Sequence, residues 1–304
     1  MGYLSQKKKL ANNRELLTVS LWIELICCTV LLFFRESTVA SFISNYAFQL
    51  YIYALIVLAF AVINRFYWQS GGLLLGVFIL FLIIGQGGDV FFTTEPMGLQ
   101  ELKVMYQSDV ASLSESEKKV SKTQTDIAGI IQSLNKNTTW QTPRTALNLS
   151  SRADDKNLIM TPHPIIRSGE VLLSEKNRAG FAELKINNME QIIFITLDFS
   201  KTTRQEQNVA LNNLAEFINM QDSPVIVFGD FGQEAWSKNF LAFKDKTGLE
   251  VKNKILLKKM KCGYNPFSIP SINLLAYKDF GVKEMAFLSS RENPHQPLIM
   301  TLNY

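Results

Sequence analysis

The distribution of apolar residues along the chain constrains its fold more than any other sequence feature. Hydrophobic residues make up 47% of the 304 residues, and nearly all the long apolar runs lie before residue 90. Three stretches, 18–34, 47–63 and 71–84, each come near the ~20 residues that a helix needs to cross a bilayer. The sequence therefore predicts a membrane segment joined to a soluble domain, and it argues against a single globule.

The basic residues next to these stretches predict an orientation. If the chain crosses three times, five of the six nearby cations share the side of the N-terminus: Lys7, Lys8, Lys9, Arg14 and Arg65. Because cytoplasmic segments carry the excess of Lys and Arg, we expect a cytoplasmic N-terminus. The predicted location is the inner (plasma) membrane. The C-terminal domain is then extracytoplasmic, which means periplasmic in a Gram-negative cell.

Glu24 lies inside the first apolar stretch, where an ionisable group is costly. Two interpretations stay open: the side chain extends toward the membrane surface, or it makes a polar contact with another helix or a partner subunit. The predicted partners are therefore the lipid bilayer and a membrane protein that contacts the apolar helices and Glu24. The net charge of +4 is mild and gives no strong case for nucleic acid.

The rest of the chain mixes strand-like runs with few helices, which is typical of an α+β domain. Pro96 and Gly98 break the chain between the two parts. We predict a membrane domain over 1–90, a linker over 91–101 and a soluble domain over 102–304. Residues 204–220 read as an amphipathic helix, and 135–156 read as loop. Strand-like runs cover 102–105, 126–131, 170–173, 180–186, 191–197 and 224–228.

The run 225–230 reads as a buried strand that stops on Asp230 in a tight turn. Strands that end this way deliver a carboxylate to the rim of a sheet, where metals and phosphates are bound. A second interpretation is that Asp230 caps its own turn through bonds from its side chain to the backbone. His295 also has two interpretations: it is a catalytic base, or it is an ordinary histidine before Pro297.

Several short motifs, in this order, resemble those of the endonuclease/exonuclease/phosphatase superfamily, which includes DNase I-like nucleases. They are Gly229-Asp230-Phe231-Gly232, Trp236-Ser237, Thr247-Gly248-Leu249 and Pro294-His295-Gln296-Pro297-Leu298. The resemblance covers residues 100–304 and is closest to bacterial members with three N-terminal membrane helices. It implies a DNase I-like four-layer α/β sandwich and hydrolysis of phosphoric esters with a divalent metal, Mg²⁺.

The chain departs from the family pattern at most of the positions that carry the chemistry. Where the family has its metal-binding Glu, this chain has Gln132, which is neutral and a weaker ligand for a hard cation. The other departures are Gln107 or Ser108 for Asn, Leu197 or Asp198 for His, Gly232 for Asn, Asn273 for Asp and Pro294 for Asp. What survives is Asp230 and His295.

These losses favour a degenerate family member, a pseudoenzyme that acts in binding or as a subunit of a membrane complex and needs no cofactor. The alternative is a divalent-metal-dependent phosphodiesterase or phosphatase with a rearranged site. In that case Asp230, His295 and Asp198 are the catalytic candidates, with Glu234 as a further ligand. Gln132 and Asp230 would then form a weak site for Mg²⁺.

The topology can be tested with a reporter fused after Tyr304. With three crossings and a cytoplasmic N-terminus, a reporter that works only outside the cytoplasm should be active there. The matched fusion after Asn64 should be inactive. Activity of a cytoplasm-dependent reporter after Tyr304 would instead support two crossings.

Overall fold

The computed structural model describes most of the chain, which forms two compact units. The described residues are 2–33, 43, 46–85, 100–107, 125–133, 146–150, 155–186, 191–252, 272–277, 279–287 and 298–304. The helical unit is built chiefly from the chain up to Gly87, and the mixed unit chiefly from the remainder.

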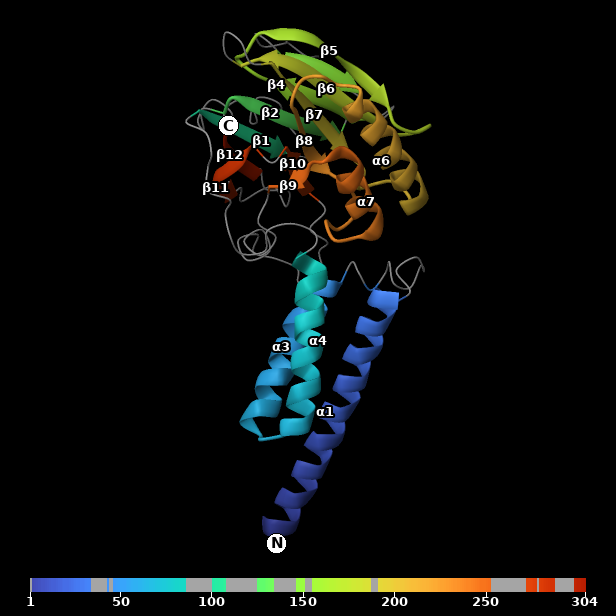
Figure 1. The fold of residues 1–304 in the computed structure, drawn as a ribbon, viewed down its shortest axis with the longest axis vertical. Helices are drawn as coiled ribbons and strands as arrows, with labels where there is room; N and C mark the ends of the chain where they lie inside the picture. Colours follow the sequence, from blue (N-terminus) through green and yellow to red (C-terminus); the bar gives the residue numbers. More distant parts are fainter. Residues whose placement is uncertain are drawn as a thin grey trace. The chain divides into compact units, whose positions relative to one another are not determined.

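The helical unit contains α1 (Gly2–Phe33), α3 (Ala47–Ile63) and α4 (Tyr67–Gly85), one at each predicted apolar stretch (Figure 1). Two segments, Asn13–Phe33 and Tyr67–Gly85, are long and apolar enough to cross a membrane, whereas α3 is shorter. The third crossing therefore stays a prediction. The predicted stretch 71–84 belongs to one of the two longer segments.

A polar contact and a small apolar core join the three helices. The Ser20 and Tyr53 hydroxyls are 2.8 Å apart and link α1 to α3, and Leu17, Val57 and Leu73 form a small apolar core. Outward-facing apolar side chains such as Trp22, which is 61% exposed, remain uncovered. Helices that are apolar on the outside as well as the inside are typical of membrane spans.

Two six-stranded sheets build the mixed unit. Sheet A has the order β11-β12-β1-β2-β4-β3 and sheet B the order β5-β6-β7-β8-β10-β9. Only β1 with β2 and β7 with β8 run parallel among the described pairs. The strands of sheet A are β1 (Glu101–Gln107), β2 (Ile127–Ser133), β3 (Ala146–Ser150), β4 (Asp155–Met160), β11 (Gly281–Phe287) and β12 (Leu298–Asn303). Those of sheet B are β5 (Ile165–Leu172), β6 (Arg178–Lys185), β7 (Gln191–Asp198), β8 (Val225–Asp230), β9 (Glu250–Val251) and β10 (Ile272–Ala276).

The expectation of a loop over 135–156 was wrong in part. Strand β3 lies inside this segment and pairs with β4, which also begins inside it. The segment is polar and has no long apolar run, so its strands form through pairing with neighbours rather than through local preference. The predicted strand-like runs 180–186 and 191–197 correspond to β6 and β7, which pair antiparallel.

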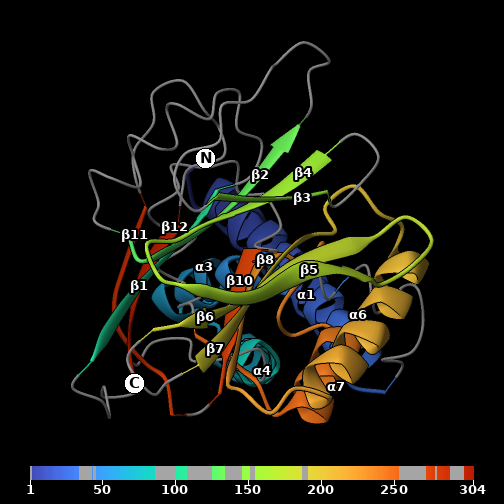
Figure 2. The ribbon, with the colours of Figure 1, turned by 90° about the horizontal axis from the view of Figure 1, so that it is seen from above.

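Alternating side chains of sheet B face two different cores. One face, with Phe194 and Phe228, packs against Val104 and other side chains of sheet A. The other, with Ile195 and Val227, packs against α6 (Arg204–Asn219) and α7 (Lys238–Thr247). Figures 1 and 2 show both helices on this flank. The described residues thus form two sheets and one helical layer, and the predicted four-layer arrangement stays a prediction.

Candidate functional site

The carboxyl ends of β7 and β8 place two of the predicted acidic residues side by side. These strands are parallel, and Asp198 pairs in register with Asp230. Successive side chains of a strand point to opposite faces, so Asp198 shares a face with Phe194 and Asp230 shares a face with Phe228. This is the face of sheet B that packs against sheet A. The structure therefore brings together two of the three catalytic candidates, at one end of the space between the sheets.

Tyr106, at the end of β1, reaches this acidic pair from sheet A. Its side chain is 1% exposed, its ring centroid lies 5.3 Å from that of Phe228, and its hydroxyl donates to the Leu197 carbonyl at 3.4 Å. Burial raises the pKa of the Tyr106 phenol well above its ordinary value, and the charges of Asp198 and Asp230 raise it further. Tyr106 is thus a neutral phenol beside both carboxylates.

Sequence reasoning missed Tyr106, although a signal was present. Leu102, Val104 and Tyr106 alternate along β1, and all three belong to the core between the sheets. The same alternation places Gln107, predicted in the position of the family's Asn, on the opposite face of sheet A. The residue that β1 offers to the acidic pair is therefore a phenol rather than an amide.

Each aspartate accepts a bond from the turn that follows it. The Gly232 N–H donates to Asp230 Oδ1 at 2.8 Å, and the Ser200 N–H donates to Asp198 Oδ1 at 2.8 Å. These are the bonds that the capping interpretation of Asp230 predicts. One oxygen of each carboxylate is therefore already engaged in local structure.

The electrostatics of the pair are unfavourable to two full charges. Burial raises the pKa of the Asp198 carboxyl, and the neighbouring Asp230 adds to this effect. Hydrogen bonds from Ser200 and the charge of Lys201 act in the opposite direction. A proton or a cation shared at this end of the sheet would relieve the repulsion.

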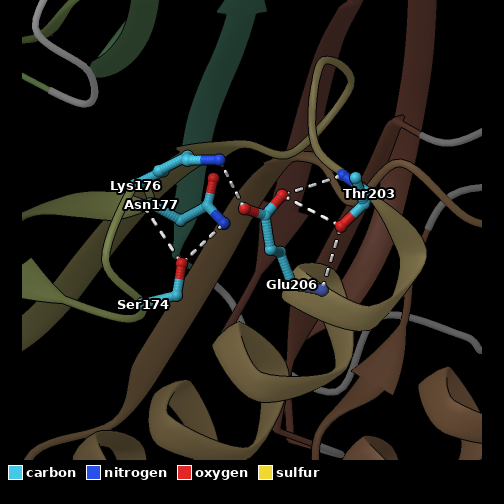
Figure 3. A network of polar contacts seen from close by, with 5 residues as sticks. All are labelled: Ser174, Lys176, Asn177, Thr203 and Glu206. Atoms are coloured by element: carbon cyan, nitrogen blue, oxygen red, sulfur yellow. Dashed lines mark hydrogen bonds and ion pairs between the residues drawn. The ribbon is translucent and has the colours of Figure 1, made fainter.

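The loop after Asp198 is held by a polar network at the start of α6 (Figure 3). Thr203 and Glu206 form a reciprocal capping box, in which Glu206 Oε2 accepts from the Thr203 N–H at 3.1 Å. Lys176 approaches the same carboxylate, with Nζ 3.1 Å from Oε1. The hydrogen bond from Lys176, followed by those from Thr203, lowers the pKa of Glu206. The network ties the turn between β5 and β6 to the first turn of α6.

Gly232 lies where the family motif has Asn, and its surroundings leave no room for a side chain. Its φ is +66°, and a Cβ there would lie 2.7 Å from the Phe199 carbonyl oxygen and would overlap the Gln207 amide nitrogen. Gln207 is itself buried and donates to the Phe199 and Thr202 carbonyls, both at 3.1 Å. The Gln207 amide therefore occupies the space beside the turn.

The remaining predicted site residues have different outcomes. Asn273 pairs with Gly229 and shares a face with Leu275, so Ile272 rather than Asn273 lies opposite Asp230. Gln132 lies in β2 in register with Lys156. Glu234 is fully buried after the β8 turn. His295 lies outside the described residues, so its role as a catalytic candidate stays a prediction.

The described donors do not form a Mg²⁺ site of the family type. Across the described ranges, no group of three or more His, Cys, Asp or Glu side chains could hold a metal ion. The two adjacent carboxylates each use one oxygen in a turn, and the third neighbour is a buried phenol. Hard cations favour several ionised oxygens, and this arrangement supplies two carboxylates without the Glu that is the family's main ligand.

Comparison with known proteins connects this architecture to solved structures. An endonuclease/exonuclease/phosphatase from Bacteroides vulgatus superposes with a TM-score of 0.53 at 10% identity, covering 67% of this chain and 99% of that one. The protein of that description from Beutenbergia cavernae gives 0.50 at 10% identity, over 67% of this chain and 72% of that one. D. rerio TDP2 with 14 humanising mutations gives 0.50 at 15% identity, over 67% and 99%.

The mixed unit has the endonuclease/exonuclease/phosphatase fold. The resemblance expected from the motifs is confirmed at the level of the fold. At these identities the likeness extends to the fold alone. No family model and no curated protein matches the sequence.

The raised pKa of Asp198 predicts a pH-dependent effect on stability. The folded state holds this proton more tightly than the unfolded state, so stability falls as pH rises from the usual value of 3.8 through the raised pKa. Asp198→Asn keeps the acceptor for Ser200 and removes the charge. We expect it to raise the free energy of unfolding at neutral pH by about 1 kcal/mol, with no gain below pH 3.8. Urea unfolding of the full-length protein measures this, with the exposed Asp222→Asn as the control.

Gly232→Asn, which recreates the family motif, should destabilise the protein. Gly248 is the matched control, because it has φ +68° and open space around its Cβ position. Gly248→Asn meets only the backbone preference, about 1 kcal/mol, whereas Gly232→Asn adds an overpacking cost of roughly 1–3 kcal/mol. Equal losses for the two variants in urea unfolding would show that the turn opens freely.

Proposed function

We propose that this protein is a membrane-anchored pseudoenzyme, in which an endonuclease/exonuclease/phosphatase fold serves binding or assembly instead of phosphoric ester hydrolysis. The observation that supports the proposal most directly is the state of the acidic pair. Asp198 and Asp230 each cap their own turn, and the buried Tyr106 phenol lies beside both. Groups engaged in this way are poorly placed to polarise a water or to take a metal.

The membrane part of the proposal rests on the helical unit. Asn13–Phe33 and Tyr67–Gly85 are long and apolar enough to cross a bilayer, and the basic residues near them favour a cytoplasmic N-terminus. The soluble domain is then extracytoplasmic, and the apolar helices are the surfaces through which a partner membrane protein would bind. Resistance of the full-length protein to alkaline carbonate extraction tests the anchoring.

A second candidate function is a phosphodiesterase or phosphatase with a rearranged site. The register pairing of Asp198 with Asp230 favours it, because it places two carboxylates together without the family's Glu. Neighbours in fold are described as endonuclease/exonuclease/phosphatase proteins, so phosphoric esters are the substrates to try. In this second candidate function, His295 would act with the two aspartates as a catalytic residue, and Mg²⁺ would be the cofactor.

Metal titration combined with an activity assay separates the two candidates. We expect calorimetry of the full-length protein in detergent to show no tight binding of Mg²⁺ or Mn²⁺, and bis-p-nitrophenyl phosphate to stay intact. The physical reason is the neutral Gln132 in place of the family's main ligand. Gln132→Glu should strengthen metal binding without restoring turnover, since loss of the base alone costs ~10²–10⁴ in rate.

Metal-dependent hydrolysis by the wild type that is lost in both Asp230→Ala and Asp198→Ala, and retained in Asp222→Ala, would establish the rearranged enzyme. The pseudoenzyme proposal would then be wrong.

A further inference from the structure

Glu24 is the most unusual titratable side chain of the helical unit. It is 4% exposed, and neither of its carboxyl oxygens has a hydrogen-bond partner among the described residues. The side chain does not extend toward an aqueous surface, as one of the two interpretations from the sequence required. It turns into the chain's own helices and contacts α4.

The contact with α4 depends on glycine. A Cβ at Gly76 would overlap Glu24 Oε1 and would lie 2.9 Å from Glu24 Cγ. One turn earlier, a Cβ at Gly72 would lie 2.8 Å from Leu21 Cδ1. The Glu24 carboxyl group therefore lies directly on the α4 backbone. The two glycines, four positions apart, permit this close approach of the helices.

Cys28 shares this face of α1, one turn beyond Glu24. It is 2% exposed, and its thiol lies 3.9 Å from the Gly76 carbonyl oxygen. Glu24 and Cys28 thus contact the same residue of α4. The exposure of Cys28 therefore reports whether this contact between α1 and α4 is closed.

No cation is available to neutralise Glu24 within the apolar segments. The sequence has no Lys or Arg over 15–33, 47–63 or 67–85. The titratable groups around Glu24 are the Cys27 and Cys28 thiols on its own helix. On α3, Tyr53 bonds Ser20 of α1, and on α4 the backbone of Gly76 faces Glu24. An ionised carboxylate buried here without a partner is therefore strongly disfavoured.

We propose that Glu24 is a proton-binding site inside the helical unit, whose neutral form packs on Gly76 and whose ionisation opens the contact between α1 and α4. This inference rests on the proposed membrane anchoring. The proton comes from water and returns to it, and no other reactant takes part. Low pH closes the contact, and high pH separates the two helices at Gly76.

Two measurements on the full-length protein in phospholipid vesicles test the site. The first is modification by dicyclohexylcarbodiimide, an apolar reagent for protonated carboxyl groups. We expect mass spectrometry to find the adduct on Glu24, with the adduct absent in Glu24→Gln and kept in the control Glu15→Gln. Glu15 is exposed at the start of the apolar segment.

The second measurement is the labelling of Cys28 by a membrane-permeant maleimide, in a Cys27→Ser, Cys262→Ser background. Thiol ionisation alone speeds labelling at high pH, so Glu24→Gln, which stays neutral, supplies the baseline. We expect the ratio of the labelling rate of wild type to that of Glu24→Gln to rise severalfold with pH. Gly76→Ala, which displaces the carboxyl group, should label quickly at every pH.

The outcomes distinguish this inference from the anchoring on which it rests. Release of the protein by alkaline carbonate would overturn the anchoring, and the proton site with it. A carbonate-resistant protein that takes no carbodiimide at Glu24, or whose labelling ratio is constant with pH, would overturn the proton site alone.

Discussion

The parallel pairing of β7 with β8 is the constraint on which the candidate site depends. It aligns Asp198 with Asp230 and brings the two following turns together. The Phe199 N–H donates to the Asp230 carbonyl at 2.7 Å and extends the pairing beyond the strands. Buried side chains on both faces hold the register, because a slip of one residue would exchange the two cores of sheet B. The acidic pair is therefore a consequence of packing on both sides of the sheet.

Close approach of a polar group to the backbone explains one glycine in each unit, Gly232 and Gly76. Gly232, at the position of an Asn in the family motif, is surrounded by Phe199 and Gln207. Gly76, in the third predicted apolar stretch, accommodates the carboxyl group of Glu24. In each case the absent side chain makes space for a polar group from another element. Restoring a side chain there would require the neighbour to move.

The acidic pair and Glu24 both bury carboxyl groups, and burial disfavours their charged forms. Asp198 and Asp230 lie together in a half-buried position, where burial and then repulsion from Asp230 raise the pKa of Asp198. Turn amides offset part of the cost. Glu24 has no such donors among the described residues. The turn amides therefore lower the cost of burying the two aspartates, whereas Glu24 has no such compensation, which favours its neutral form.

Much of the fold could be predicted from the sequence, because apolar runs and alternation are local signals. They located the three helices of the first unit, the strands around β7 and β8 and the helix after Thr203, and the motif around Asp230 indicated the fold now seen. Strands β3 and β4 were missed in part, since a polar segment becomes a strand only when a neighbour pairs with it.

The composition of the site depended on long-range geometry. The sequence by itself determined that Asp230 ends a strand, that Gln132 and Gly232 replace family residues, and that a carboxyl group lies within an apolar helix. Only the tertiary structure decided that Asp198 lies beside Asp230, that Tyr106 rather than Gln107 faces them, and that Glu24 packs on Gly76. The reason is that these neighbours are far apart in the chain, and only sheet register and helix packing bring them together.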